Sequence, residues 1–318
     1  MWKIYTLMVI FFVSSCGQNL PPNFKADIDQ NQRVKLNVGQ ELVPKVDILF
    51  VIDNSGSMSG HQVHLKNQIQ YYANEILKIP SIDFHIGVLG SDYLNGFTRP
   101  YLTRKTPNVL ETLKLNLLLG SSGKSIEKFF DPVYLALNPS FRTGRSSSFL
   151  RKRATLNLIF ITDTDDQSKE ISATSFYNFL LGLKQDSAKV ITFAAIIKKS
   201  SCSGEYSSHN IRRLKQFIHT SRGKSVNLCS NYAVELIELA KKVVREAFTF
   251  KLKEVPIYES IVLSYGTTII PRSITEGWSY NPKTVSIRIA AKFFKKLGNQ
   301  NIIQKLQLSY KRARPGDL

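Results

Sequence analysis

The sequence predicts an α/β fold, in which a doubly wound, mostly parallel sheet is followed by a small β-rich domain. Two observations predict it. Nearly continuous apolar runs alternate with longer amphipathic stretches, as in chains whose strands are buried on both faces of a parallel sheet. After Phe248 the pattern changes to short segments separated by turn residues, which is typical of antiparallel β structure.

The elements follow from these patterns. Buried strands are expected over residues 46–52, 84–89, 156–162 and 190–197. Shorter strands are expected over 98–103 and 225–228. Helices are expected over 61–77, 125–137, 172–183, 212–221 and 232–248. Pro132 should interrupt the second of these helices. The short strands of the last part are expected over 251–265, 267–271, 285–290 and 303–310.

The N-terminus is expected to be an export signal that ends at a lipidated cysteine. Lys3 supplies a short positive segment, and residues 4–13 form an apolar run too short to span a bilayer. Val13-Ser14-Ser15-Cys16 resembles the bacterial lipobox, in which the cysteine carries the lipid. The residue after the cysteine is Gly17 and not Asp, and in lipoproteins of Gram-negative bacteria this implies the outer membrane. We therefore expect a lipid-anchored protein of the cell envelope. An ordinary signal peptide is the alternative.

Four segments are therefore expected along the chain. They are a signal peptide (1–15), the lipidated Cys16 with a tether (16–43), the α/β domain (44–248) and a small β-rich domain (249–318). The tether is predicted because residues 18–42 are polar, contain Pro21-Pro22 and show no sustained period.

Two further cysteines, Cys202 and Cys229, follow at a distance. An exported chain meets an oxidising compartment, where paired thiols usually form a disulfide. We therefore expect a bridge between Cys202 and Cys229, with two free buried cysteines as the alternative.

The chain is strongly basic, with a net charge of +19. Nucleic acid is a common partner of basic proteins. However, an exported protein rarely meets nucleic acid, and no basic run is interleaved with aromatic residues, so no nucleic-acid partner is expected. The interpretations that remain are a solvated basic surface and contact with an anionic envelope surface.

An Asp-x-Ser-x-Ser motif directly follows the first buried strand, as Asp53-Asn54-Ser55-Gly56-Ser57. One carboxylate and two hydroxyls on a tight loop can direct their oxygens at one small hard cation. Mg²⁺ prefers such an octahedral shell of oxygens. The carboxyl ends of the strands carry the sites of doubly wound sheets, so this loop is the candidate site.

The motif, at this position, resembles the metal-ion-dependent adhesion site of von Willebrand factor A-type (vWA) domains, and the resemblance covers about residues 44–248. It implies that the metal is bound by Asp53, Ser55 and Ser57. By register, Ser122 takes the place of the family's threonine on a second loop, with Ser121 and Ser125 as the alternatives. Ile161-Thr162-Asp163 matches the family's Ile-Thr-Asp, whose aspartate usually reaches the metal through water.

The resemblance also implies a function. A bound Mg²⁺ or Mn²⁺ would accept an acidic side chain from a protein or peptide ligand, so the expected role is adhesion or protein recognition, not catalysis. The first alternative is an envelope scaffold or assembly factor that needs no metal.

A remote alternative is an enzyme. Asp163-Thr164-Asp165 also resembles the first motif of haloacid dehalogenase-like phosphatases, where one aspartate attacks phosphate and the next acts as an acid or base. Gln167 stands where that motif prefers Thr or Val, and the motif normally lies on the first strand.

Overall fold

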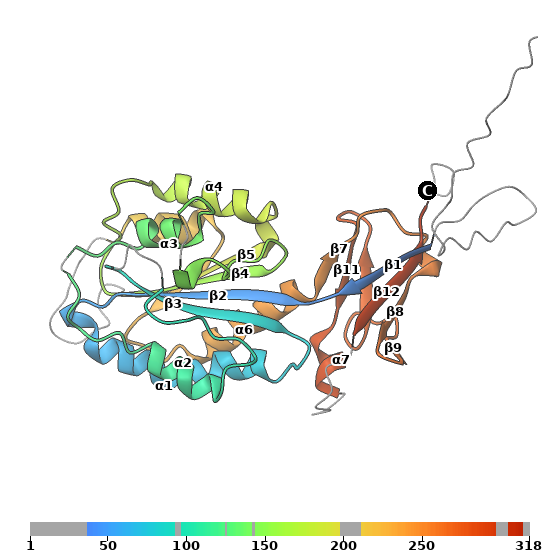
Figure 1. Ribbon diagram of the computed structural model, residues 1–318, viewed down its shortest axis with the longest axis horizontal. Coiled ribbons are helices and arrows are strands. Elements are labelled where there is room, and N and C mark those ends of the chain that lie inside the picture. The colour runs from blue at the N-terminus through green and yellow to red at the C-terminus, as the bar shows by residue number, and fades with distance from the viewer. Residues whose placement is uncertain are drawn as a thin grey trace, which may run out of the picture.

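The computed structural model describes residues 37–92, 97–124, 126–141, 144–197, 211–296 and 305–313. The described residues form an α/β part and a smaller β-rich part that lie end to end (Figure 1). The predicted export signal, Cys16 and Cys202 lie outside the described residues, so lipidation and the Cys202–Cys229 disulfide stay predictions. No helix in the described ranges is long and apolar enough to cross a membrane.

The α/β part is built on a five-stranded parallel sheet with the order β3-β2-β4-β5-β6. Its strands are β2 (Lys45–Ile52), β3 (Asp83–Gly90), β4 (Thr155–Thr162), β5 (Val190–Ile196) and β6 (Lys224–Asn227). Beyond β3, a single antiparallel bridge between Ile86 and Leu102 occupies the place of the strand expected over 98–103.

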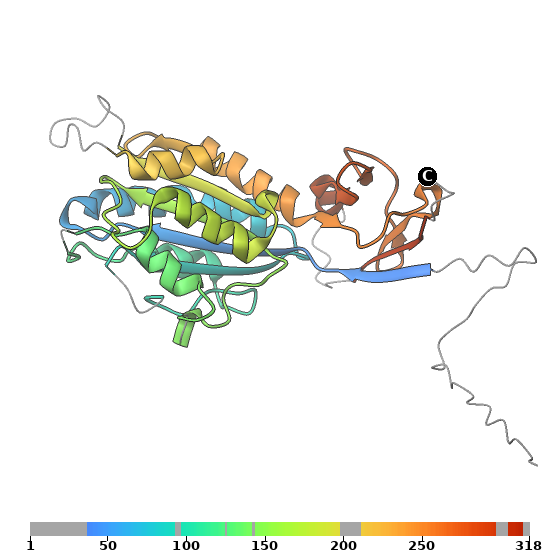
Figure 2. The ribbon, with the colours of Figure 1, turned by 90° about the horizontal axis from the view of Figure 1, so that it is seen from above.

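Helices cover both faces of this sheet (Figures 1 and 2). One face carries α1 (Ser59–Leu77), α2 (Val109–Asn116) and α6 (Ala233–Ala247). The other face carries α3 (Phe130–Leu137), α4 (Ala173–Lys184) and α5 (Arg213–Thr220). Alternate residues of a strand serve the two cores: Phe50 of β2 lies in the first and Val51 in the second. The predicted doubly wound α/β fold class is confirmed.

The β-rich part consists of two antiparallel sheets with the orders β1-β12-β8-β9 and β10-β11-β7. Its elements are β1 (Asn37–Leu42), β7 (Thr249–Lys251), β8 (Val262–Tyr265), β9 (Thr268–Ile269), β10 (Trp278–Asn281), β11 (Ser286–Ile289), α7 (Ala291–Lys296) and β12 (Leu306–Lys311). Phe248 at the end of α6 packs on Phe294 of α7 with ring centroids 4.5 Å apart, so one apolar core joins the two parts.

Strand β1 differs from the sequence prediction, which places residues 16–43 in a tether. Residues Asn37–Leu42 instead pair antiparallel with β12, with Leu42 opposite Leu306. The pairing partner lies at the other end of the chain, so no local period marks this strand. The chain then continues from β1 into β2 through the short link at Val43 and Pro44. The α/β part is consequently inserted between the first and later strands of the β-rich part.

Helix α3 also differs from its prediction. It begins at Phe130, not at residue 125, so Pro132 lies in its first turn. A proline is tolerated there, because the N–H groups of the first turn have no partner within the helix. The residues before α3 form a loop that reaches the end of β2, where the candidate site lies.

Candidate metal centre

Three loops meet at the carboxyl ends of β2 and β4, at the end of the α/β part that is remote from the β-rich part (Figure 1). The first loop leaves β2 at Asp53, passes through the short turn Gly56–Met58 and enters α1. The second loop comprises residues 120–123, and the third begins at Asp163 after β4. The main-chain N–H of Asp53 donates to the carbonyl oxygen of Ile161 at 2.9 Å, which holds these two loops in register.

The carboxylate of Asp53 is fully buried and is held by two donors. Its Oδ1 accepts the main-chain N–H of Ser55 at 2.9 Å, and its Oδ2 accepts the hydroxyl of Thr162 at 2.8 Å. Burial raises the pKa of Asp53, while these hydrogen bonds lower it and the charge of Asp163 raises it further. The carboxylate is therefore fixed in position within a site that favours neutralisation of its charge.

The hydroxyls of Ser55 and Ser57 lie side by side, with their oxygens 3.2 Å apart. Ser55 is nearly buried, whereas Ser57 is exposed. The pair thus extends from the buried carboxylate of Asp53 toward the surface. Oxygens so arranged can face one cation that is also open to solvent or to a partner.

A second loop, residues 120–123, lies against the first. The side-chain amide of Gln62 donates to the carbonyl oxygens of Asp53 at 3.0 Å and Gly120 at 2.9 Å, which ties the two loops together. The N–H of Gly123 donates to the carbonyl oxygen of Asn54 at 2.8 Å. A Cβ at Gly123 would lie 2.6 Å from that oxygen, so only glycine permits the approach.

This contact places Ser122, the predicted counterpart of the family's threonine, on the exposed surface next to the first loop. Its neighbour Ser121 is also exposed, and its carbonyl oxygen would be 3.9 Å from a Cβ at Gly56. Ser125 lies outside the described residues. Asp163 is buried except for 7% of its surface. The structure therefore brings together Asp53, Ser55, Ser57, Asp163 and the loop of Ser122.

Glu127, which sequence reasoning missed, is a further acidic residue of this region. It is buried, and its side chain accepts the amide of Gln167 at 2.7 Å. Burial and the charges of Asp53 and Asp163 raise the pKa of Glu127 to about 7. In the sequence, the one indication is that Glu127 is an acidic residue shortly after the second loop. No sequence pattern places it beside Asp53 and Asp163.

The raised pKa of Glu127 has a measurable consequence for the metal-free protein. Between pH 4.5 and about 7 the folded chain binds more protons at Glu127 than the unfolded chain does. The free energy of unfolding should therefore decrease as pH rises through this window. Urea unfolding in EDTA should show this decrease with pH, and the decrease should be smaller in the Glu127→Gln variant. The exposed Glu170→Gln should leave it unchanged, and an equal slope in wild type and Glu127→Gln would contradict the prediction.

The two acids after Asp163 have structural roles. Asp165 accepts the main-chain N–H groups of Arg212, Arg213 and Leu214 at 2.9 to 3.0 Å, at the start of α5. Asp166 accepts those of Phe129 and Phe130 at the start of α3. Negative side chains are stabilising at helix N-termini. Asp165 is thus engaged with the start of α5.

His61 and His64 lie on the first turns of α1. His64 bonds to the carbonyl oxygen of Ser230 at 2.8 Å and contacts the ring of Tyr232, so it joins α1 to the start of α6. Burial lowers the pKa of His61, while the negative charge of Asp163 acts in the opposite direction and raises it. Among the described residues, no group of three or more His, Cys, Asp or Glu side chains is arranged to hold a metal ion.

The donors present fit a hard divalent cation. The site offers one fixed carboxylate, two adjacent hydroxyls and a second-loop serine, all of them oxygen donors. Magnesium and manganese prefer oxygen ligands and retain several waters, so they do not need a cage of three acidic side chains. Residues Asp53, Ser55 and Ser57 would hold the ion directly.

No protein-family model and no curated protein sequence matches this chain. Solved structures do match it. The mussel byssus proximal thread matrix protein 1 with a zinc-occupied MIDAS motif is 14% identical, with 68% of this chain and 51% of that chain covered and a TM-score of 0.42. This chain thus spans about half the length of the mussel protein.

Two bacterial structures are similar as well. A von Willebrand factor type A protein from Catenulispora acidiphila is 11% identical, with 87% of this chain and 65% of that chain covered and a TM-score of 0.40. The pilus adhesin SpaC from Lactobacillus rhamnosus GG, in its open conformation, is 12% identical, with 88% and 41% covered and a TM-score of 0.39.

Proposed function

We propose that this chain is a vWA-type recognition protein of the bacterial envelope that binds a protein partner through a divalent metal. The observation that carries the proposal is the buried, hydrogen-bonded carboxylate of Asp53 next to the paired hydroxyls of Ser55 and Ser57 at the exposed end of the sheet. The resemblance of Val13-Ser14-Ser15-Cys16 to a lipobox supports attachment to a membrane by lipid, which would hold the strands from Asn37 onward at the membrane surface.

Each group has a separate task in this proposal. Asp53 supplies the negative charge, and Thr162 and the N–H of Ser55 fix its orientation. Ser55 and Ser57 supply neutral oxygens, so the ion keeps a positive charge that is not cancelled by the protein. When bound, Mg²⁺ or Mn²⁺ offers a coordination position to a carboxylate oxygen of the partner. An acidic peptide segment is therefore the chemistry that the site recognises.

The test is a calorimetric titration of Mg²⁺ and Mn²⁺ into the full-length protein and into a Ser55→Ala/Ser57→Ala variant. The variant loses both hydroxyls but keeps Asp53 and its two hydrogen-bond donors, so it should fold normally. Its affinity is expected to fall by roughly 10- to 100-fold. Equal affinity in the two proteins, or no binding to the wild type, would refute the proposed site.

Partner binding separates this function from the scaffold alternative. Binding of acidic peptides that disappears in EDTA and returns with Mg²⁺ supports metal-dependent recognition. Binding that persists in EDTA supports an envelope scaffold or assembly factor that does not use the metal.

A further inference from the structure

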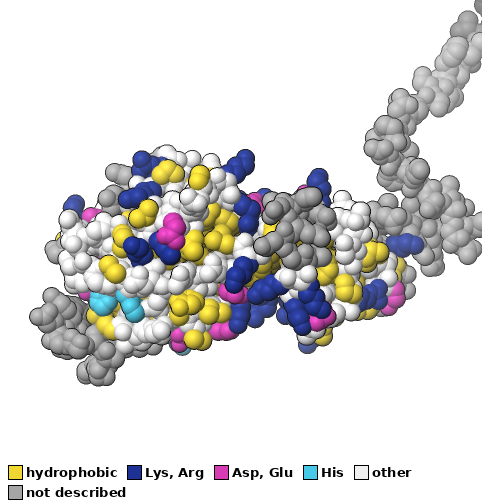
Figure 3. Space-filling view, turned by 90° about the horizontal axis from the view of Figure 1, so that it is seen from below, with side chains coloured by type: hydrophobic (Ala, Val, Ile, Leu, Met, Phe, Trp, Pro, Cys, Tyr) yellow, Lys and Arg dark blue, Asp and Glu magenta, His cyan; other side chains and the backbone are white. Residues whose placement is uncertain are grey.

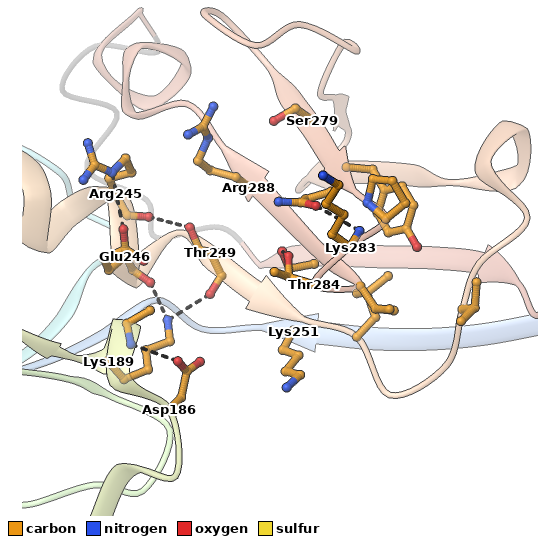
Figure 4. Close-up of a pocket in the computed structure, with 18 of the residues that line it drawn as sticks. Asp186, Lys189, Arg245, Glu246, Thr249, Lys251, Ser279, Lys283, Thr284 and Arg288 are labelled. Carbon is orange, nitrogen blue, oxygen red and sulfur yellow. Dashed lines mark hydrogen bonds and ion pairs between the residues drawn. The ribbon is translucent and has the colours of Figure 1, made fainter. Parts of the chain in front are cut away.

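A basic groove of about 1100 Å³ lies between the α/β part and the β-rich part, at the end of the sheet opposite the candidate metal centre (Figure 4). One wall is formed by the turn before β5, at Asp186 and Lys189, and by the end of α6 at Arg245 and Glu246. The other wall and the floor are formed by the sheet β10-β11-β7 and the hairpin that joins β10 to β11. We call this recess the basic groove.

The register of the sheet makes the floor polar. Directly opposed residues of antiparallel strands share a face, and successive residues alternate between faces. The two rows that face the groove are Thr249–Arg288–Ser279 and Lys251–Ser286–Asn281. At the alternate positions Trp278, Ile287 and Ile289 are buried in the core, while Tyr280 also lines the groove. The floor therefore presents hydroxyl, amide and cationic groups over a rigid apolar support.

Positive charge prevails in the groove. Its cationic side chains are Lys189, Arg245, Lys251, Lys253, Lys283 and Arg288, against the carboxylates of Asp186 and Glu246. Arg245 pairs with Glu246 at 3.3 Å, and the ammonium group of Lys189 donates to the carbonyl oxygens of Thr249 and Glu246.

The other four cations of the groove form no ion pair with any residue that the structure describes. They are Lys251, Lys253, Lys283 and Arg288, and they come from β7, the segment after it, the hairpin and β11. Like charges brought together in a recess repel one another, and a recess focuses their field on an anion. The groove is therefore suited to a ligand with several negative charges.

Further cations lie around the junction, next to the basic groove. A smaller recess of about 220 Å³ shares Arg245, Ile274 and Arg288 with the basic groove. It adds Lys241, which pairs with Glu238, and Lys295, which pairs with Glu75 of the same recess. Figure 3 shows Lys and Arg side chains gathered on that face where the two parts meet.

We propose that the basic groove binds an anionic polysaccharide, a sugar polymer that carries carboxylate or phosphate groups. The cations match its charges, while the hydroxyl and amide groups of the two floor rows match sugar hydroxyls. A flat bilayer reaches the exposed Lys251 and Lys283, whereas a single polymer chain can also enter the recess and contact the half-buried Arg288 on its floor. The proposal does not depend on the metal or on the proposed function.

The experiment titrates the full-length protein in EDTA with polygalacturonate, in which each sugar bears a carboxylate, and with neutral dextran. Polygalacturonate is expected to bind and dextran is not. Lys251→Glu/Lys283→Glu should weaken binding by at least about tenfold, since both reversed charges face the polymer. These lysines are exposed, so the fold should be preserved. Arg288→Gln, which retains much of the side chain, should also weaken binding.

A matched control separates the groove from general charge. Lys169→Glu/Lys215→Glu reverses two exposed lysines that do not line the groove and changes the net charge equally. It should alter affinity by less than about twofold. An equal loss in this control would overturn the proposal. Polyglutamate or phosphatidylglycerol vesicles that bind as tightly, with the same loss in the groove variant, would overturn it too, in favour of an acidic peptide or a lipid surface.

Discussion

Asp53→Asn is expected to abolish divalent-cation binding without unfolding the protein. Asparagine keeps the shape of the side chain, and its amide oxygen still accepts the N–H of Ser55. The variant lacks the one negative charge that is fully buried in the first loop. Loss of a group that only supports a ligand costs about 10- to 100-fold in metal affinity, so loss of this charge should cost about 100-fold or more.

Calorimetric titration with Mg²⁺ and Mn²⁺ measures this loss. Asp186→Asn is the matched control, because it removes the same charge in a turn at the opposite end of the sheet. It should bind metal as the wild type does. Without metal, Asp53→Asn should be at least as resistant to urea as the wild type, because it relieves the repulsion among Asp53, Asp163 and Glu127. Metal affinity within a few-fold of the wild type would show that the ion binds elsewhere.

Asp47→Ala is expected to cause the largest loss of stability, about 3 to 5 kcal/mol. Asp47 and Lys184 are both fully buried, and the carboxylate of Asp47 lies 3.3 Å from the ammonium nitrogen of Lys184. Its other oxygen lies 2.8 Å from Nε of Arg151. Removal of Asp47 leaves two cations close together, one of them buried, and leaves the N–H of Arg151 without its acceptor.

Urea unfolding near neutral pH tests this prediction against Glu111→Ala, which breaks the exposed pair of Glu111 with Lys114. That control should change the free energy of unfolding by less than about 0.5 kcal/mol, because exposed ion pairs contribute little. A cost below about 1 kcal/mol for Asp47→Ala would mean that Lys184 loses its proton or reaches water in the variant. Burial already lowers the pKa of Lys184 to about 8, which makes loss of the proton the first alternative to examine.

The sequence predicted the features that depend on local pattern. Continuous apolar runs marked β2, β3, β4 and β5, because buried parallel strands have no polar face. The position of Asp53 and Asp163 directly after two such runs placed both at one edge of the sheet, where the structure has them. Parallel strands carry their carboxyl ends to the same edge, so a motif at each end predicted a shared site.

The features that were missed depend on distant contacts. Strand β1 is identified by its pairing with β12, and its own residues show no alternation that separates it from a polar tether. Helix α2 is too short to show a clear helical period. The start of α3 was misplaced because Pro132 lies in its first turn and not in its middle. Glu127 belongs to the site because Gln167, from the loop after β4, holds it there. Such a contact joins segments whose approach is decided by the packing of whole helices.

The continuous path from β1 into β2 has a mechanical consequence. If lipid holds the N-terminus and a partner pulls at Asp53, tension enters the folded chain at Asn37 and leaves at the end of β2. Extended backbone of this length measures about 50 Å and is joined by covalent bonds throughout. Most of the β-rich part then lies beside the line of force. Strand β2, which is second in the sheet order, carries the load along its own covalent backbone, so the hydrogen bonds that pair it with β3 and β4 are not loaded in shear.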